Sequence, residues 1–583
     1  MPAHEDRLPR SIDIMNSGTN QRTGGQILVD QLKTHGVDMA FCVPGESYLG
    51  VLDALYDAPI RLVVCRHEAG AANMADAYGK LTGRPGLALV TRGPGACNAA
   101  IGIHTASQDS TPLILLIGQV PRTFADREAF QEIDYRRMFG QMAKWVAQID
   151  DPRRVPEYVG RAFHAAISGR PGPVVLALPE DMLTQEAEAP AAPRAQRTAA
   201  SPAPAQIDRL RTLLERAQRP IAILGGTGWT SEACASFRRF AEAWHLPVAC
   251  AFRYQDLFDN DHPLYAGDVG IGVNPKLARR VQDADLVLAA GPRLGEMTTS
   301  GYTLLEAPSP RQTLVHAHAG AEELGSVYAA DLAINSGMPE LAALLADLQP
   351  AAKPGWTAET AAARAEYVGW NAPVRVPGPL QMAEVVHHLR ERLPADAIVA
   401  NGAGNFSSWV HRFHRYRRFR SQLGPTSGAM GYGVPAAVAA KSVHPERTVI
   451  GFSGDGDFLM TGQELATAVQ YRLPIVLIVV NNGCYGTIRM HQERKYPGRV
   501  HGTELKNPDF AAYARAFGAL GETVETTEQF APAFERALAA NAPALLELRL
   551  SEEVITPTTT LSAIRERALQ QRGIAQRAGD DHA

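Results

Sequence analysis

The chain has 583 residues, a formal net charge of −4 and a sequence pI of about 6.5. Hydrophobic residues at 45% and charged residues at 20% are ordinary for a globular protein, which excludes extensive disorder. Because the chain has no excess of positive charge, nucleic-acid binding is disfavoured and a small-molecule substrate is favoured. At roughly 150 residues per domain, the length predicts three or four domains.

Cysteine usage and hydropathy predict the cellular location. The six cysteines include no CxxC pair, which is typical of a reducing compartment. Residues 1–20 contain acids and prolines but no apolar run, and no later stretch has about eighteen uninterrupted apolar residues. We therefore expect no signal peptide, no membrane span and a cytoplasmic protein.

The first predicted unit, residues 22–186, alternates helical patterns with apolar runs at Leu87–Val90, Leu113–Ile117 and Val174–Leu178. Strands that alternate with helices predict a parallel α/β sheet. Residues 187–205 are rich in Ala and Pro, cannot bury a core, and are expected to form an extended linker.

The second predicted unit, residues 206–350, has apolar runs at Ile221–Leu224 and Leu286–Ala290, each followed by glycine. Residues 348–379 are again rich in Ala, Pro and Gly. The third unit, residues 378–560, has four candidate strands: Ile398–Ala400, Thr448–Phe452, Ile475–Val480 and Leu545–Leu550. The predicted fold class is α/β, with three consecutive domains whose parallel sheets are flanked by helices.

The strongest functional signal is Gly454-Asp455-Gly456, which directly follows an apolar run and precedes Asn481-Asn482 by one helix and one strand. Both segments are expected at the carboxyl ends of parallel strands, where ligands bind. Glycines allow backbone N–H groups to approach a diphosphate, while carboxylate and amide oxygens suit Mg²⁺. A plain turn and a loop cap are the alternative, but the spacing favours a metal site.

Two weaker signals accompany this motif. Glu68 opens a helix-like stretch after the apolar Leu62–Val64, where a glutamate often only complements the helix dipole. Met430 lies in the glycine-rich segment Ser427–Gly433, although a methionine is more often a core filler.

With these motifs, the chain resembles the thiamine diphosphate-dependent decarboxylase and carboligase superfamily over nearly its whole length. The resemblance implies a pyrimidine-binding domain, a middle Rossmann-like domain and a diphosphate-binding domain, in that order. It implies that Mg²⁺ is bound by Asp455, the side chain of Asn482 and the backbone carbonyl of Cys484. It also implies that Glu68 hydrogen-bonds N1′ of the cofactor's aminopyrimidine, while the cofactor supplies the carbanion chemistry.

The same resemblance assigns further contacts with the cofactor. Gly428 would accept the 4′-amino group through its carbonyl, and Met430 would support the bent cofactor. The glycines of the Gly-Asp-Gly motif, Gly454 and Gly456, would stand at the diphosphate, together with Gly404 and Asn405.

Four ordered segments of the first unit look like the acetolactate synthase branch of this superfamily: Thr91–Asn98, Asp109–Pro112, Gly118–Val120 and Ala129–Glu132. By that resemblance, Pro94, Asn98 and Gln131 line the cofactor and Phe130 lines the substrate pocket. The expected catalytic residues are Glu68, Gln131 and Phe130.

The chain also departs from that branch. Asn405 stands where the branch usually has Gln-His, Met297 replaces a substrate-entrance arginine, and His491 replaces a tryptophan. FAD is left open: Gly225-Gly226-Thr227 could cradle a dinucleotide or form only a tight turn, and Arg293 matches a flavin-binding arginine.

The resemblance implies an enzyme that decarboxylates a 2-oxo acid and ligates the resulting enamine to a second carbonyl. The alternatives are a simple 2-oxo acid decarboxylase, a hydroxyketone or aldehyde lyase, and a non-catalytic cofactor-binding homologue. Discrimination among them is expected from His104, Gln131, Met297 and His491. Because Glu68 and the Gly-Asp-Gly motif lie in different domains, the resemblance also implies a homodimer or homotetramer with composite active sites.

Overall fold

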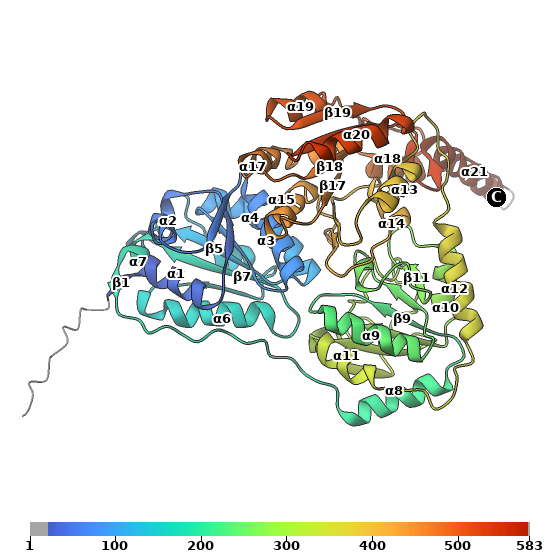
Figure 1. Ribbon diagram of the computed structural model, residues 1–583, viewed down its shortest axis with the longest axis horizontal. Helices are drawn as coiled ribbons and strands as arrows, with labels where there is room; N and C mark the ends of the chain where they lie inside the picture. The colour runs from blue at the N-terminus through green and yellow to red at the C-terminus, as the bar shows by residue number, and fades with distance from the viewer. Residues whose placement is uncertain (1–20, 581–583) are drawn as a thin grey trace, which may run out of the picture.

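The computed structural model describes residues 21–580, and side chains through Gly573. This part of the chain contains three six-stranded parallel sheets, which confirms the predicted α/β class. Figure 1 shows the first domain in blue to teal, the middle domain mainly in green and the third in yellow, orange and red. The prediction that residues 1–20 carry no signal peptide lies outside the described residues. Among the described helices, none combines the length and apolarity needed to cross a bilayer.

The first sheet has the strand order β3-β2-β4-β5-β7-β6. Its central strands are buried along their whole length, because helices cover both faces of a parallel sheet. The strands are β2 (Met39–Cys42), β3 (Arg61–Val64), β4 (Gly86–Val90), β5 (Leu113–Gln119), β6 (Trp145–Gln148) and β7 (Pro173–Pro179). The principal helices are α1 (Gly24–Thr34), α2 (Leu49–Tyr56), α3 (Glu68–Thr82), α4 (Gly93–Asp109) and α6 (Val155–Ile167).

The middle sheet has the order β11-β10-β9-β12-β13-β14, the doubly wound arrangement of dinucleotide-binding folds. Its strands are β9 (Pro220–Leu224), β10 (Val248–Cys250), β11 (Tyr265–Asp268), β12 (Leu286–Ala290), β13 (Thr313–His318) and β14 (Leu332–Asn335). The flanking helices are α8 (Pro204–Arg216), α9 (Ser231–Ala243), α10 (Pro275–Asp283) and α11 (Met338–Ala346).

The third sheet has the order β16-β15-β17-β18-β20-β19, which repeats the topology of the first. Its strands are β15 (Ile398–Asn401), β16 (Gln422–Leu423), β17 (Val449–Gly454), β18 (Val476–Asn481), β19 (Leu520–Val524) and β20 (Ala544–Arg549). The helices are α13 (Met382–Arg392), α14 (Ser407–Phe413), α15 (Gly433–Val443), α16 (Asp455–Phe458), α17 (Leu465–Gln470), α18 (Gly486–Lys495), α19 (Phe510–Ala516) and α20 (Thr527–Ala539).

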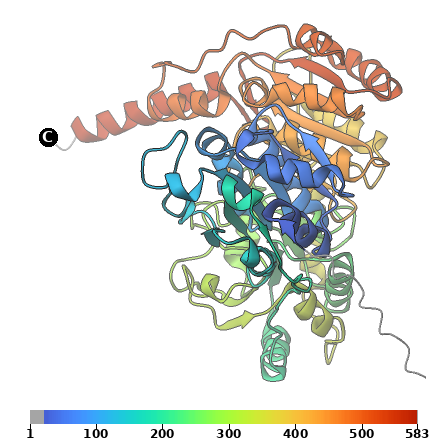
Figure 2. The ribbon, with the colours of Figure 1, turned by 90° about the vertical axis from the view of Figure 1, so that its left-hand side faces the viewer.

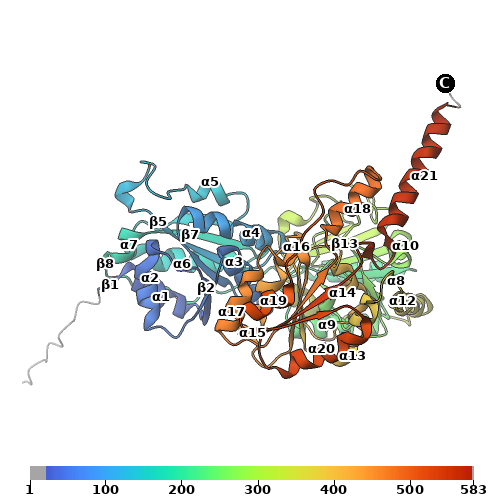
Figure 3. The ribbon, with the colours of Figure 1, turned by 90° about the horizontal axis from the view of Figure 1, so that it is seen from above.

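The connecting segments differ in character. No helix or strand lies between β8 (Glu186–Ala187) and α8, where an extended linker is predicted. The second Ala-rich segment instead contains α12 (Thr357–Trp370). This stretch has several alanines and no proline, and alanine strongly favours a helix. Figures 2 and 3 show α21 (Leu561–Asp580) projecting from the body.

A buried ionic cluster joins the first and third domains. The ammonium of Lys80, on α3, lies 2.8 Å from Asp76 Oδ2 and also pairs with Asp109. The hydroxyl of Tyr432 donates to Asp76 at 2.7 Å, and Thr426 N donates to Asp109 at 2.8 Å. These contacts fix α3 against the loop that precedes α15.

Candidate active site

Glu68 is the first residue of α3. His67, in extended conformation, caps the helix by accepting the N–H of Ala69 at Nδ1, at 3.1 Å. The Glu68 side chain is 9% exposed, and its Oε2 accepts a hydrogen bond from Asn98 Nδ2 at 2.9 Å. A Cβ on Gly95 would lie 3.4 Å from Oε1, so α4 packs closely against the carboxylate. Two residues predicted from the resemblance are therefore hydrogen-bonded to each other.

The start of α3 is held by Glu464, in the third domain. Its buried carboxylate accepts the backbone N–H groups of Arg66 and His67, each at 3.0 Å, and the hydroxyl of Thr467 at 2.6 Å. A Cβ on Gly70 would lie 2.3 Å from Oε1, so only glycine admits the carboxylate here. Burial raises the pKa of Glu464. Sequence reasoning missed this residue, because its backbone partners lie 398 and 397 positions away and no local pattern marks it.

Asp455 lies where β17 meets α16, at the carboxyl edge of the third sheet. It is 3% exposed, and its Oδ1 accepts Gly456 N at 2.9 Å. Oδ2 accepts Gly483 N at 2.9 Å and Asn507 Nδ2 at 2.8 Å. Burial raises the pKa of Asp455, and a bound cation would favour its ionised form.

The two asparagines that follow β18 differ in their contacts. Asn481 accepts from Asn507 at 2.9 Å and donates to Glu547 at 2.8 Å, so its amide is used within the protein. The amide of Asn482 forms no hydrogen bond to any residue in the range 21–580, which leaves its oxygen available to a ligand. This difference supports the assignment of Asn482, rather than Asn481, as the ligand.

Cys484 lies opposite Glu504 in an isolated antiparallel bridge. The hydrogen bonds of this bridge are made by its neighbours, Gly483 through the carbonyl and Tyr485 through the N–H. The carbonyl of Cys484 itself therefore points away from the bridge. A carboxylate, an amide oxygen and a backbone carbonyl are the hard donors that Mg²⁺ prefers, and the residues present fit this ion. No cluster of three or more His, Cys, Asp or Glu side chains occurs in the described range, and this site is not one either, because an amide and a backbone carbonyl would supply two of its three oxygens.

The glycines of the motif are explained by aromatic neighbours. A Cβ on Gly454 would lie 2.9 Å from the ring of Phe406, and one on Gly456 would lie 2.5 Å from the ring of Tyr485. Side-chain packing therefore requires glycine at both positions, in addition to any approach of a diphosphate.

Asp457, another residue that sequence reasoning missed, joins two loops at the carboxyl edge. Its Oδ1 accepts Ala403 N at 3.0 Å, after β15, and Gly431 N at 2.9 Å, before α15. Thr461 reinforces the second loop by donating its hydroxyl to the Gly431 carbonyl at 2.6 Å. Burial raises the pKa of Asp457 to about 6.

These two loops carry four of the predicted cofactor contacts. Gly404 and Asn405 precede α14, and Asn405 Oδ1 accepts the hydroxyl of Thr487 at 3.0 Å. Gly428 is exposed, with a φ of +69° and no atom within 4 Å of a built Cβ, so its positive φ rather than crowding favours glycine at this position. The side chain of Met430 is half-buried.

The remaining predicted residues of the first domain gather at the start of α4. Pro94 is exposed in the first turn, and a Cβ on Gly93 would lie 2.7 Å from the carbonyl of Gln131. Gln131 has a φ of +67°, a strained conformation for a residue with a side chain. Phe130 is 74% exposed, and His104 is exposed further along α4.

A close backbone contact within the middle domain explains why position 226 is a glycine. Gly226 has a φ of +69°, and a Cβ on it would lie 2.0 Å from the Gly291 carbonyl, so the crossing of the β9 and β12 ends requires glycine. The guanidinium of Arg293 lies 3.1 Å from Glu323, which also pairs with Arg170. These contacts favour the tight-turn interpretation and give no independent support for FAD.

Comparisons with known proteins identify the family of the chain. Residues 22–138, 207–345 and 402–548 match the N-terminal thiamine pyrophosphate-binding domain, the central domain and the C-terminal thiamine pyrophosphate-binding domain of thiamine pyrophosphate enzymes. The isozyme 2 acetolactate synthase large subunit of Escherichia coli is 31% identical over 91% of this chain and 96% of its own length. The acetolactate synthase large subunit of Corynebacterium glutamicum is 30% identical over 92% of this chain and 88% of its own.

The chain therefore belongs to the thiamine pyrophosphate enzyme family. Within that family it lies on the acetolactate synthase-like branch, and it is a thiamine diphosphate-dependent enzyme of the carboligase type.

Proposed function

We propose that the chain decarboxylates a small 2-oxo acid and ligates the remaining donor fragment to a second carbonyl compound. The observation that carries the proposal is the hydrogen bond from the exposed Asn98 to the buried Glu68, together with the Asp455, Asn482 and Cys484 oxygens, in a chain similar to acetolactate synthases along its length. A protein that only binds the cofactor has no chemical need for the carboxylate at N1′.

The protein's residues have distinct proposed roles. Thiamine diphosphate supplies a nucleophilic carbon and an electron sink when bound. Glu68 holds the proton at N1′, and Asn98 orients the Glu68 carboxylate through their 2.9 Å hydrogen bond. Met430 supports the cofactor, and Gly428 accepts its 4′-amino group.

The metal is proposed as Mg²⁺, held by the Asp455 carboxylate, the Asn482 amide oxygen and the Cys484 carbonyl. Asn507 keeps the Asp455 carboxylate oriented by donating to Oδ2. Outer partners of this kind fix ligand geometry in metal sites.

The acceptor is the least constrained part of the proposal. Phe130 is proposed to line the substrate pocket, with Gln131 beside it. Met297 is half-buried and His491 is exposed on α18, and neither provides the fixed guanidinium that would hold a second carboxylate. We therefore propose that the acceptor includes carbonyl compounds other than 2-oxo acids.

The direct test is product analysis from pyruvate and bulkier 2-oxo acids, with Mg²⁺ and thiamine diphosphate, in wild type and Glu68→Gln. CO₂ release with a condensed hydroxyketone, lost in the variant, is expected. Aldehyde as the sole product would make the chain a decarboxylase instead. No consumption of any oxo acid would refute the proposed donor.

FAD has no role in this proposal, because Arg293 and the Gly225-Gly226 turn are accounted for by contacts within the protein. Absorbance near 450 nm in the purified, heat-released fraction measures whether FAD is carried. We also propose a cytoplasmic location, which the six free cysteines support.

The active sites are proposed to be composite, in a homodimer or homotetramer. In the described range, no hydrogen bond or ion pair joins Glu68 or Asn98 to Asp455 or Asn482. Apolar side chains are exposed beside both halves: Ile101 on α4, and Leu459 and Met460 after α16. These surfaces support a partner that brings the halves together.

Subunit mixing tests this arrangement. Glu68→Gln and Asp455→Asn are each expected to be inactive alone. In a composite dimer, random mixing restores about one quarter of the wild-type activity, because half of the dimers are mixed and each has one intact site. Mixed subunits that stay inactive, with mixing verified by differential tags, would show that each site is built within one chain.

A further inference from the structure

The segment that follows β10, residues 253–256, connects the middle domain to the third. Gln255 N donates to the side-chain oxygen of Gln422 at 2.7 Å. Asp256 Oδ2 accepts the N–H groups of Ser421 and Gln422 at 3.0 and 3.2 Å. The middle domain is therefore fastened to the edge of the third sheet at β16.

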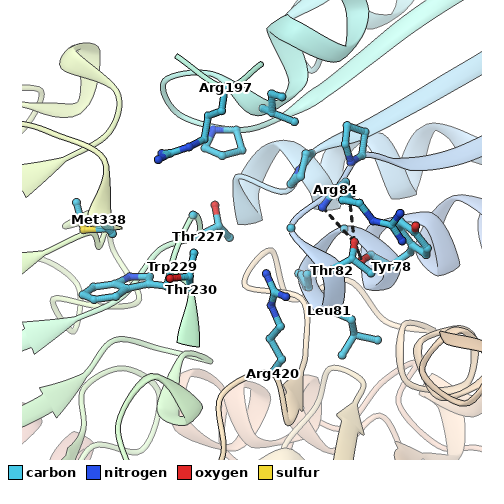
Figure 4. Close-up of a pocket in the computed structure, with 18 of the residues that line it drawn as sticks. Tyr78, Leu81, Thr82, Arg84, Arg197, Thr227, Trp229, Thr230, Met338 and Arg420 are labelled. Carbon is cyan, nitrogen blue, oxygen red and sulfur yellow. Dashed lines mark hydrogen bonds between the residues drawn. The ribbon is translucent and has the colours of Figure 1, made fainter. Parts of the chain in front are cut away.

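Arg253, the first residue of this segment, lies in the wall of the cavity at which the three domains meet. Figure 4 shows that cavity, with Leu81 of the first domain, Thr227 of the middle domain and Arg420 of the third around it. Arg253 is 6% exposed and has a φ of +65°, a costly conformation for a residue with a side chain. Its Nη2 donates at 2.8 Å to the carbonyl of Gly402, which does not line the cavity. Both the burial and the backbone strain therefore accompany a contact with the third domain.

Gly402 follows β15 and begins the loop that carries two of the proposed cofactor contacts, Gly404 and Asn405. The carboxylate of Asp457 packs directly against this backbone, because a Cβ on Gly402 would lie 2.1 Å from its Oδ2. Its Oδ1 accepts the N–H of Ala403 at 3.0 Å. The start of the loop is thus held by a carboxylate of its own domain and by a cation of the middle domain.

The guanidinium of Arg253 keeps its charge in this buried position. Burial lowers the pKa of Arg253 to about 10, while the nearby carboxylates of Asp109 and Asp457 raise it, so the group is charged at neutral pH. Its Nε and Nη1 have no hydrogen-bond partner within residues 21–580, where the Gly402 carbonyl is its acceptor. A hydrogen bond from a charged donor is roughly twice as strong as a neutral one, which suits it to fixing a loop.

We propose that Arg253 is a positioning residue for the cofactor. It fixes residues 402–405 and thereby sets the affinity for the diphosphate of thiamine diphosphate. This role rests on the proposed placement of the diphosphate at Gly404 and Asn405. The middle domain, from which no cofactor contact is proposed, controls through this one side chain how tightly the cofactor is held.

The test is a titration of the cofactor-free full chain with thiamine diphosphate at saturating Mg²⁺, followed by circular dichroism. Arg253→Met is expected to raise the Kd at least about tenfold, because it removes a hydrogen bond from a charged donor. At saturating cofactor, kcat for CO₂ release should change little, since the loss is one of binding. Arg253→Gln is a milder change that removes the charge but keeps an amide donor, and it is expected to raise the Kd about fivefold.

Arg364→Met is the matched control. Arg364, on α12, also donates to backbone carbonyls, those of Asn260 and Asp261, but not to residues 402–405. Its Kd for thiamine diphosphate should equal that of wild type. A wild-type Kd in either Arg253 variant, with the fold intact, would overturn the proposal. An equal rise of the Kd in Arg364→Met would also overturn it, because Arg253 would then contribute only general stability.

Asp457→Ala separates the role of Arg253 from the proposed placement of the diphosphate. It removes the acceptor that holds residues 403 and 431, and it is expected to raise the Kd at least as much as Arg253→Met. A raised Kd in Asp457→Ala alone would refute only the role of Arg253, whereas a wild-type Kd in both variants would show that the diphosphate binds elsewhere. Because the titration needs no substrate, a failure of the proposed reaction would appear in the product analysis and not here.

Discussion

The contact between Glu464 and the start of α3 gives the sharpest prediction about catalysis. The carboxylate crosses from the third domain to the first and accepts two consecutive backbone N–H groups just before Glu68. It does not touch the Glu68 side chain, so its proposed role is to position that residue. Replacing it with glutamine keeps the size and one carbonyl oxygen but removes the charge, while Glu464→Ala removes both acceptors.

The expected size of the effect on kcat follows from the strength of these hydrogen bonds. A hydrogen bond to a charged group contributes about 1.5–3 kcal/mol, and a neutral one about half of that. Glu464→Gln is therefore expected to loosen the start of α3 by about 1–3 kcal/mol. Misplacement of a catalytic group by about 1 Å lowers the rate roughly 100-fold. We expect kcat to fall roughly tenfold in Glu464→Gln and roughly 100-fold in Glu464→Ala, with little change in KM for the oxo acid.

The assay is CO₂ release from the best 2-oxo acid at saturating thiamine diphosphate and Mg²⁺. Arg66→Ala is the control, because it keeps the backbone N–H that Glu464 accepts and removes only the side chain, which is hydrogen-bonded to Gln470. Its kcat should remain near that of wild type. A wild-type kcat in Glu464→Ala, with the fold intact by circular dichroism, would refute the positioning role.

Three further predictions concern stability and metal binding. Burial raises the pKa of Asp256 to about 6. Its contribution to stability is therefore full below about pH 4 and lost as the pH rises through about 6, so Asp256→Asn should raise the Tm at pH 8 but not at pH 4. Lys80→Met leaves Asp76 and Asp109 buried without their cation and should cost about 3–5 kcal/mol, seen as a lower Tm; an unchanged Tm would contradict the ionic cluster. Asn507→Ala should weaken Mg²⁺ binding about 10- to 100-fold in a titration followed by activity, and unchanged affinity would remove Asn507 from the site.

The local sequence pattern was sufficient to predict much of the fold. Apolar runs such as Leu113–Ile117 and Leu286–Ala290 fall within β5 and β12, because a strand buried on both faces must be apolar throughout. The Ala-rich α12 was not predicted, since prolines and glycines on both sides hid a helix whose register depends on packing against β11 and α10. The strand orders, and the shared topology of the first and third sheets, are equally absent from local pattern.

The residues of the candidate site also divide into those that the sequence predicted and those that only the structure showed. The sequence by itself singled out the Gly-Asp-Gly and Asn-Asn segments, because their spacing and strand context mark them, whereas Glu68 was singled out only by the family resemblance. Only the tertiary structure decided that Glu464 and Asp457 hold the loops around them, and that Asn482, not Asn481, has its amide available. The physical reason is distance along the chain. A hydrogen bond between residues tens to hundreds of positions apart exists only once the sheets and domains have packed, and no local periodicity encodes it.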